Sequence, residues 1–304
     1  MPAKAIPPHR DRLQSKILVW IVAPVLCALA ATRTVGLLLY VPHLRMFVLQ
    51  SVAVSVCFAL LAWRLKAATP AAASTGGVIC LCLTYGTHIH MAPVLRSALV
   101  PLIALFGLTF LATRAGRKRK AERGLAESHS GRTTSQVVAN LGIAALFAFP
   151  LSLIVVFLAW PDANALIGST VTSVCVLSAL AEATADTVSS EIGQAFGGTP
   201  FMLTTLRRVP PGTDGAISLY GTLAGIAAAA LVASTGAPAL GMSPTECLVA
   251  FAAGVAGLFF DSLLGATIER KGWINNDLVN FTSTAFAAAL ALLAVRFAQD
   301  HLFH

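Results

Sequence analysis

Residues 246–268, ECLVAFAAGVAGLFFDSLLGATI, form an apolar run whose only charged interior residue is Asp261. A transmembrane helix needs about 20 mostly apolar residues, so this stretch is predicted to cross a membrane as a helix. Runs of similar length recur near 17–41, 44–63, 74–92, 93–112, 137–159, 164–183, 215–235 and 278–298. The strand-like alternation of a membrane β-barrel is absent. The predicted fold class is therefore all-α, a polytopic integral membrane helical bundle of about nine helices, within a range of eight to ten.

The composition supports a membrane protein and excludes soluble classes. Of the 304 residues, 57% are hydrophobic and only 11% are charged, against about 25% charged in a soluble domain. A soluble enzyme, a secreted disulfide scaffold and a DNA-binding protein are therefore excluded. We expect a single membrane domain over 1–304, with variable N-terminal spans at 1–112, a basic loop at 113–136 and a motif-bearing core at 137–298. An alternative count of eight spans treats 74–112 as one re-entrant unit plus one span.

The charge distribution predicts the orientation. The chain has 21 Lys and Arg against 13 Asp and Glu, a net charge of +8. With nine spans and a cytoplasmic N-terminus, most of the basic residues fall on the inner side, as the positive-inside rule requires. We therefore expect an inner or plasma membrane protein whose active face is cytoplasmic, with membrane lipid around it and no nucleic-acid partner. The run Lys118–Lys120 is interpreted as a solvated loop that contacts anionic lipid. The sequence carries no signal for an oligomeric state.

The densest group of acidic residues is AEATADTVSSEIG, residues 181–193, which continues the sixth span. A helix would place Glu182, Asp186 and Ser189 or Ser190 on one face. Two carboxylates one turn apart repel each other unless a cation or a basic group lies between them. Hard oxygen ligands suit magnesium, so the stretch predicts a divalent cation site. The alternative is an ordinary helix end that faces water.

The loop before the seventh span carries groups that suit phosphate. Two arginines supply planar donors, and a flexible turn precedes a helix start, where backbone N–H groups favour an anion. These residues are Arg207 and Arg208, followed by Gly212, Thr213, Asp214 and Gly215. The alternative is a loop whose arginines only set the topology, with Thr213 or Asp214 as a helix N-cap.

A third group lies in residues 257–281. Asp261 and Ser262 interrupt the apolar eighth span, and an ionisable residue inside a span is a functional candidate. Asn275, Asn276, Asp277 and Asn280 follow at the start of the ninth span. A capping turn explains Asn276 or Asp277, but it does not explain four such residues in six positions.

The stretch GRTTSQVVAN, residues 131–140, extends a polar stripe into the fifth span. Arg132, Gln136 and Asn140 recur at i, i+4 and i+8, which places them on one helix face. We interpret the stripe as part of the same inner cavity as the acidic groups.

Taken together, these segments resemble a polytopic membrane family that includes animal transmembrane protein nineteen and the plant phytyl-phosphate kinase of tocopherol synthesis. The resemblance rests on TRAGRKRK, GRTTSQVVAN, ADTVSSEIG, VPPGTDGAISLYGTLAG, FFDSLLGATIE and VNF, in this order from residue 113 to about 290. The chain departs from the family pattern at Val188, Asp214, Ala216 and Glu269, where the family has an aromatic residue, Asn, Gly and Gln.

The resemblance implies a membrane-embedded kinase that passes a phosphoryl group from a nucleoside triphosphate, CTP or ATP, to an isoprenyl monophosphate with magnesium. In this interpretation Asp186 and Asp261 are catalytic. The metal ligands are Asp186, Glu191, Asp261, Asn276 and Asp277. The phosphates contact Arg207, Arg208, Gly212, Thr213, Gly215, Arg132, Gln136, Asn140 and Ser262. No P-loop motif is present. The alternative function is a transporter or flippase of a lipid-linked phosphate or another anion, although such proteins place their sites near the membrane midplane within internal repeats.

Overall fold

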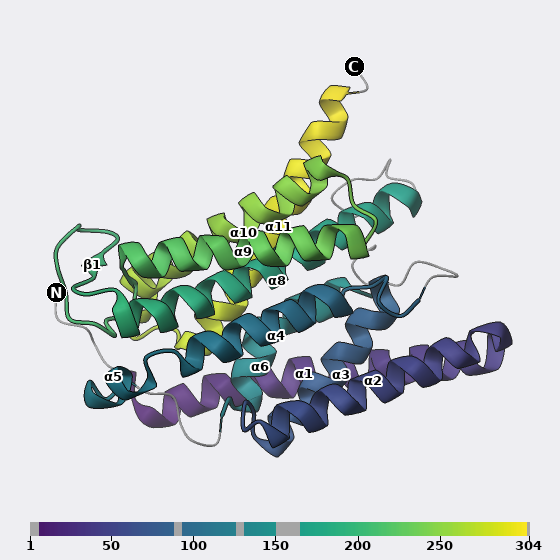
Figure 1. Ribbon diagram of the computed structural model, residues 1–304, viewed down its shortest axis with the longest axis horizontal. Helices are drawn as coiled ribbons and strands as arrows, with labels where there is room; N and C mark the ends of the chain where they lie inside the picture. Colours follow the sequence, from purple (N-terminus) through teal and green to yellow (C-terminus); the bar gives the residue numbers. More distant parts are fainter. Residues whose placement is uncertain (1–5, 88–92, 126–130, 150–164, 303–304) are drawn as a thin grey trace.

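The computed structural model describes residues 6–87, 93–125, 131–149 and 165–302. Within these ranges it has nine long helices (Figure 1). They are α1 (Pro8–Tyr40), α2 (Arg45–Arg64), α3 (Pro70–Thr87), α4 (Leu99–Arg114), α6 (Thr134–Phe147), α8 (Ala165–Phe196), α9 (Leu219–Ala239), α10 (Pro244–Leu264) and α11 (Asn276–Leu302). The short elements are η1 (Pro42–Leu44), α5 (Arg117–Glu122), the π-helical turn η2 (Gly265–Glu269), and the antiparallel strands β1 (Phe201–Met202) and β2 (Ala216–Ile217).

The all-α prediction is confirmed, and each predicted apolar run corresponds to one long helix. Residues 74–112 contain two helices, α3 and α4, and the helix count agrees with the predicted range of eight to ten spans. The part of the predicted span 137–159 that follows residue 149 lies outside the described residues. Six of the described helical segments are long and apolar enough to cross a membrane, and α4 and α6 are shorter apolar helices.

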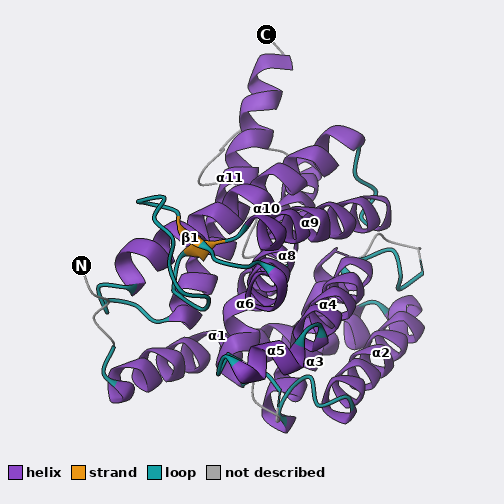
Figure 2. Cartoon of the chain, turned by 60° about the vertical axis from the view of Figure 1, so that its left-hand side comes forward, coloured by secondary structure: helices purple, strands orange, loops and turns teal. Residues whose placement is uncertain are grey.

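Helix α8 is the centre of the bundle. It packs against α4, α6, α9, α10 and α11, which surround it in the views of Figures 1 and 2. In its apolar window 89% of the residues are buried, whereas the other candidate spans have 44% or less. Most side chains in this window of α8 therefore face protein and not lipid.

Small residues let two neighbours approach α8 closely. A Cβ atom on Gly225 of α9 would lie 2.7 Å from the Ala185 carbonyl oxygen. On α10, a Cβ atom on Gly257 would lie 2.4 Å from Cγ of Glu182. Helices in a membrane gain their stability from such close packing. Glycine at these positions fixes how near α9 and α10 come to the acidic turns of α8.

Side-chain caps fix where several helices begin. Thr133 and Gln136 form a capping box at the start of α6, and Ser243 and Glu246 form one at the start of α10. Ser218 caps α9 by accepting a hydrogen bond from the Gly221 N–H group at 3.2 Å. Helix α9 therefore begins at residue 219, after the predicted start at 215, and an N-cap at Thr213 or Asp214 is wrong.

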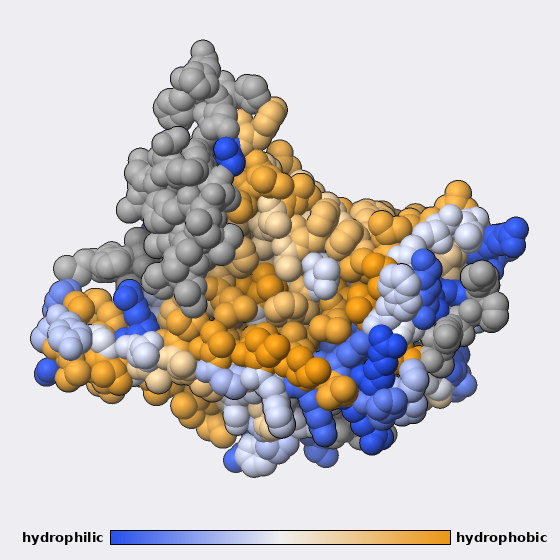
Figure 3. Space-filling model, turned by 180° about the vertical axis from the view of Figure 1, so that it is seen from behind, coloured by the Kyte–Doolittle hydropathy of each residue, from blue (hydrophilic) through white to orange (hydrophobic). Residues whose placement is uncertain are grey.

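The segments predicted to share the inner side lie at one end of the bundle. The start of α1 contacts residues 273–277, and Arg114 donates a hydrogen bond to the Leu65 carbonyl oxygen. Arg123 donates one to the carbonyl oxygen of Gln194. In Figure 3 apolar residues cover the middle of the visible face, and hydrophilic residues gather toward its right-hand side, which is the end with α5 and β1 in Figure 1. This polar end carries the candidate site.

Asn275 fastens α1 to the start of α11. Its side-chain amide donates to the Asp11 carboxylate at 2.8 Å and to the Ser15 hydroxyl at 2.9 Å, and its backbone N–H donates to Gln14 Oε1 at 2.8 Å. Its side-chain Oδ1 atom accepts a hydrogen bond from the N–H group of Leu278 at 3.1 Å and so caps α11. Asn275 is buried, so the loss of its amide would leave several polar groups without partners.

We therefore expect Asn275→Ala to lower the free energy of unfolding by about 1–3 kcal/mol, because it removes both a helix cap and buried hydrogen bonds. Thermal unfolding of the detergent-solubilised protein measures this. Thr282→Ala on the same helix is the control, since the exposed Thr282 hydroxyl only donates to Leu278 within α11. An equal loss of stability in both variants would contradict the role of Asn275.

Candidate functional site

A polar cavity of about 360 Å³ opens at the polar end of the bundle. Its walls come from α6, α8, α10, η2, the start of α11 and the loop that precedes α9. Most of the site residues predicted from the sequence line it. They are Arg132, Gln136, Asn140, Asp186, Glu191, Gly212, Thr213, Gly215, Asp261, Ser262 and Asn276. Segments more than a hundred residues apart in the chain thus meet at one cavity.

Two carboxyl groups meet in this cavity, across the interface of α8 and α10. Asp186 and Asp261 are partly buried and interact directly. The hydroxyl of Ser283 on α11 donates a hydrogen bond to Asp261 Oδ2 at 3.1 Å. Glu269 of η2 also lines the cavity and is close enough to interact with both aspartates. The cavity therefore gathers negative charge, which is costly unless cations offset it.

Arg132 supplies positive charge to this cavity, because it interacts electrostatically with Asp186. Two amides extend the polar wall, since Asn280 of α11 donates to the Asn140 side-chain oxygen at 3.4 Å. Asn140 in turn donates to the Gln136 carbonyl oxygen at 2.8 Å. The predicted polar stripe of Arg132, Gln136 and Asn140 therefore lines the same cavity as the acidic pair.

The backbone of Arg132 is held by the segment between α2 and α3. Its N–H group donates to the Ala67 carbonyl oxygen, and its own carbonyl oxygen accepts from the Thr69 N–H group, both at 3.0 Å. The preceding Gly131 has φ +77°, and a Cβ atom there would lie 2.5 Å from the backbone of Ala67. Only glycine adopts this conformation at such a distance without strain.

The loop at 211–218 covers one side of the cavity and packs on η2. Gly215 has φ +71°, and a Cβ atom there would lie 2.0 Å from the backbone nitrogen of Ala266. Asp214 in this loop is exposed to solvent on one side, and its partial desolvation raises the pKa of its carboxyl group, an effect that the nearby Arg270 partly offsets. The loop is therefore fixed to η2 by backbone contact, and π-helical turns occur frequently at functional sites.

Three predicted residues lie away from the cavity. Arg207 and Arg208 are exposed on the segment between β1 and β2 and do not line the cavity. Asp277 faces α1, where its carboxylate accepts a hydrogen bond from the Ser15 hydroxyl at 2.6 Å. Among the predicted cations, Arg132 is therefore the one that the fold brings to the acidic pair.

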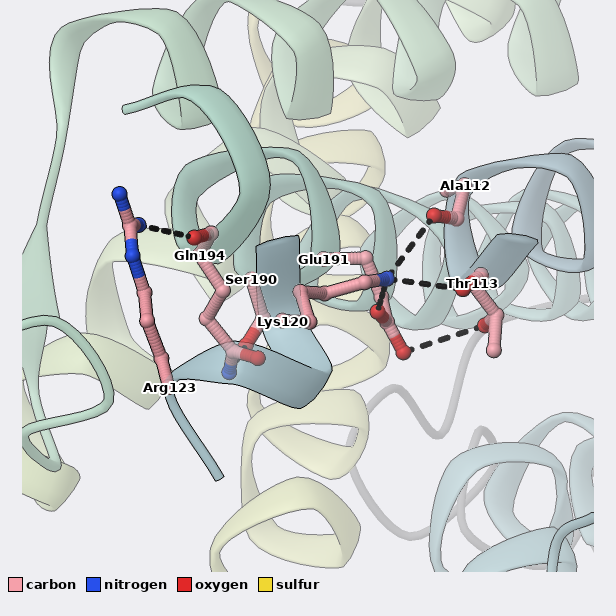
Figure 4. A network of polar contacts seen from close by, with 7 residues as sticks. All are labelled: Ala112, Thr113, Lys120, Arg123, Ser190, Glu191 and Gln194. Atoms are coloured by element: carbon pink, nitrogen blue, oxygen red, sulfur yellow. Dashed lines mark hydrogen bonds and ion pairs between the residues drawn. The ribbon is translucent and has the colours of Figure 1, made fainter. Parts of the chain in front are cut away.

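Glu191 lines the cavity but has partners on α4 and α5 (Figure 4). It forms an ion pair with Lys120, and the Thr113 hydroxyl donates to its other oxygen at 3.1 Å. Lys120 also donates to the Thr113 carbonyl oxygen at 2.8 Å and is only 1% exposed. The expectation of a solvated run at Lys118–Lys120 is therefore wrong for Lys120, because α5 folds back onto the end of α8.

Glu182, which lies one turn before Asp186 on α8, belongs to the acidic stretch for which a cation site is predicted, but it is not among the metal ligands named from the sequence. It is 1% exposed, and its Oε1 atom has no hydrogen-bond partner among the described residues. It also interacts electrostatically with Asp186. The i, i+4 spacing placed both carboxylates on one face, but the sequence did not show that this face is enclosed.

The donor set fits magnesium when it is completed by a substrate. Within the described part of the chain, no three His, Cys, Asp or Glu side chains are close enough to hold a metal ion alone. Mg²⁺ is usually bound by one or two carboxylates together with phosphates and water. Asp186 and Asp261 supply two carboxylates, and Asn276 adds an amide oxygen at the same cavity. These residues could hold the ion while a nucleotide supplied the remaining ligands.

The buried ion pair predicts a large effect on stability. Removal of one partner of a buried pair costs about 3–5 kcal/mol, because the other charge stays buried without compensation. We expect Lys120→Met to lower the unfolding temperature markedly in detergent. Lys118→Met is the matched control, since Lys118 is exposed two positions earlier on α5.

The double variant Lys120→Met, Glu191→Leu tests the cause of that loss. It removes both charges, so it is expected to regain a large part of the lost stability. A double variant that is less stable than Lys120→Met alone would contradict an ion pair as the cause.

Comparisons with known proteins identify the family to which the chain belongs. The model of the family described as "Integral membrane protein DUF92" matches residues 53–288. An uncharacterised membrane protein of Methanocaldococcus jannaschii is 37% identical over 195 residues, which are 64% of this chain and 75% of the relative. The chloroplastic protein VTE6 of Arabidopsis thaliana is 32% identical over 197 residues, 64% of this chain and 57% of VTE6.

A third relative, an uncharacterised membrane protein of Synechocystis, is 33% identical over 192 residues, 63% of this chain and 71% of that protein. No solved structure matches the chain. The family model covers most of the chain, including every described residue that lines the polar cavity. This chain is an integral membrane protein and belongs to the DUF92 family.

Proposed function

We propose that the protein is a membrane-embedded kinase that converts an isoprenyl monophosphate to its diphosphate with a nucleoside triphosphate and magnesium. The observation that carries the proposal is the meeting of Asp186 and Asp261 beside Arg132 in a polar cavity at one end of the bundle. The family resemblance of the motifs, which includes a plant phytyl-phosphate kinase, supports the same reaction, as does the 32% identity with VTE6.

The reaction needs positioning and charge neutralisation more than covalent chemistry. An oxygen of the acceptor phosphate attacks the γ-phosphorus, a new P–O bond forms, the bond to the bridging oxygen breaks, and the nucleoside diphosphate leaves. The attacking oxygen is already ionised, so no strong general base is needed. Magnesium, when bound, would neutralise charge that develops on the transferred group.

The residues of the cavity would divide this work. Asp186 and Asp261 would hold the metal, with Asn276 beside them. Arg132 would bind and orient phosphate oxygens through its planar guanidinium group. The backbone N–H groups of Gly212, Asp214 and Gly215 are candidate donors to the nucleotide, since this loop lines the same cavity as the carboxylates. We place this face in the cytoplasm, where CTP and ATP are available.

We expect purified protein to form diphosphate from an isoprenyl monophosphate with CTP or ATP and magnesium, and chelation of the metal to abolish the reaction. Asp186→Asn and Asp261→Asn are each expected to lower kcat by about 10²–10³-fold, because they weaken charge stabilisation at the transferred group. The measurement is formation of radiolabelled diphosphate.

Glu246→Gln is the matched control for these variants. It makes the same carboxylate-to-amide change at the opposite end of α10, and glutamine still completes the capping box with Ser243. We expect it to keep the activity. If the wild type formed no product with any acceptor or nucleotide, while liposomes showed substrate movement that Asp261→Asn abolished, the kinase would be rejected in favour of a transporter or flippase.

A further inference from the structure

A second cavity, of about 280 Å³, lies between α2, α3, α4 and α6, next to the polar one. Its inner wall is apolar and includes Phe58, Ala72, Gly76, Leu102, Phe106 and Leu141. The two cavities share Arg132 and Asn140 in their linings. Ala183, which lies one turn before Asp186 on α8, also lines the apolar cavity. The acidic pair and this apolar space are therefore neighbours across one polar boundary.

The charges of the apolar cavity lie at one end. Its described lining includes Lys66, Arg114, Arg117 and Arg132 and no acidic residue. Lys66 lies just after α2, and Arg114 is the last residue of α4, both at the polar end of the bundle. Leu102 and Gly76 lie deeper, along α4 and α3. The cavity thus runs from a cationic mouth into an apolar interior. This matches a ligand that has an anionic head and a single hydrocarbon tail.

Aromatic rings form one wall between the mouth and the interior. The Phe58 and Phe106 rings meet edge to face with centroids 5.2 Å apart, and Phe106 stacks with Phe110 at 5.9 Å. The Arg114 guanidinium group lies 4.0 Å from the Phe110 ring centroid. These rings present an apolar face to a branched or unsaturated tail.

The length of the cavity suits an isoprenoid chain. Leu102 and Arg114 both line it and lie twelve residues apart on α4, which corresponds to about 18 Å of helix. A cavity of this length has room for several isoprene units in line. A membrane phospholipid has two acyl chains and would need a wider space.

We propose that this apolar cavity binds the tail of the isoprenyl phosphate, with the phosphate at Arg132 facing Asp186 and Asp261. The assignment rests on the proposed kinase function and specifies its acceptor site. It predicts that the depth of the cavity limits the length of the acceptor tail.

A substitution at Gly76 tests the depth. A Cβ atom there would meet only Phe58 Cε1, at 3.8 Å, so the backbone accepts a side chain. We expect Gly76→Leu to lower kcat/KM for phytyl phosphate by about tenfold or more, since a hydrophobic pocket discriminates tails by this amount. The kcat/KM for dimethylallyl phosphate should stay unchanged.

Gly107→Leu is the matched control, because a Cβ atom at Gly107 of α4 would have no neighbour within 4 Å. It should leave both acceptors unaffected. Phe106→Leu is a second variant with the opposite expectation, since it widens the cavity and should favour bulkier tails over phytyl phosphate. If Gly76→Leu or Phe106→Leu changed kcat/KM by the same factor for every acceptor, the tail site would be rejected.

A binding measurement separates this assignment from the kinase. A phytyl phosphate analogue with a diazirine at the tail end should label peptides from α2, α3, α4 or α6 of the wild type, the helices that line the cavity. Unlabelled phytyl phosphate should compete, whereas phosphatidic acid should not. Labelling without diphosphate formation would overturn the kinase and keep the binding site. Diphosphate formation with labelling elsewhere, or equal competition by phosphatidic acid, would overturn the tail site alone.

Discussion

The enclosure of α8 by five other helices is the constraint on which the site depends. A charged group in contact with lipid is costly, so a helix that carries Glu182 and Asp186 must turn them toward protein. Neighbouring helices bury the apolar part of α8. Its acidic turns therefore contact polar groups only near the polar end of the bundle. Asp261, Ser283 and Arg132 come from three other segments and provide that environment.

Close packing and the site have the same structural origin. The glycines of α9 and α10 contact α8 in the turns that carry its carboxylates, as Gly225 does at Ala185 and Gly257 at Glu182. A larger side chain at either position would hold the helices apart. The approach that stabilises the bundle also sets the distance between Asp186 and Asp261, so helix packing controls the geometry of the cavity.

The sequence was sufficient to predict the helices and the acidic pair. Apolar runs define membrane helices because lipid leaves few other solutions, and scarce charge made Asp186 and Asp261 conspicuous. The same patterns did not reveal which charged side chains pair with one another. Lys120 looks like its basic neighbours, and only the fold-back of α5 shows that it neutralises Glu191. Arg207 and Asp277 have the right chemistry in the right segments, but the β1–β2 segment and the start of α1 direct them elsewhere.

The backbone pairing of Arg132 with Ala67 and Thr69 links the two parts of the chain that differ most in character. The motifs lie after residue 112, and the earlier spans have little beyond apolar composition, which suggests interchangeable modules. The pairing argues against that view. A chimaera that joined the first three helices of one relative to the remainder of another would place a foreign connector against Gly131 and Arg132. The stability of the chimaera would depend on how well that connector packs, so the two parts are expected to have evolved together.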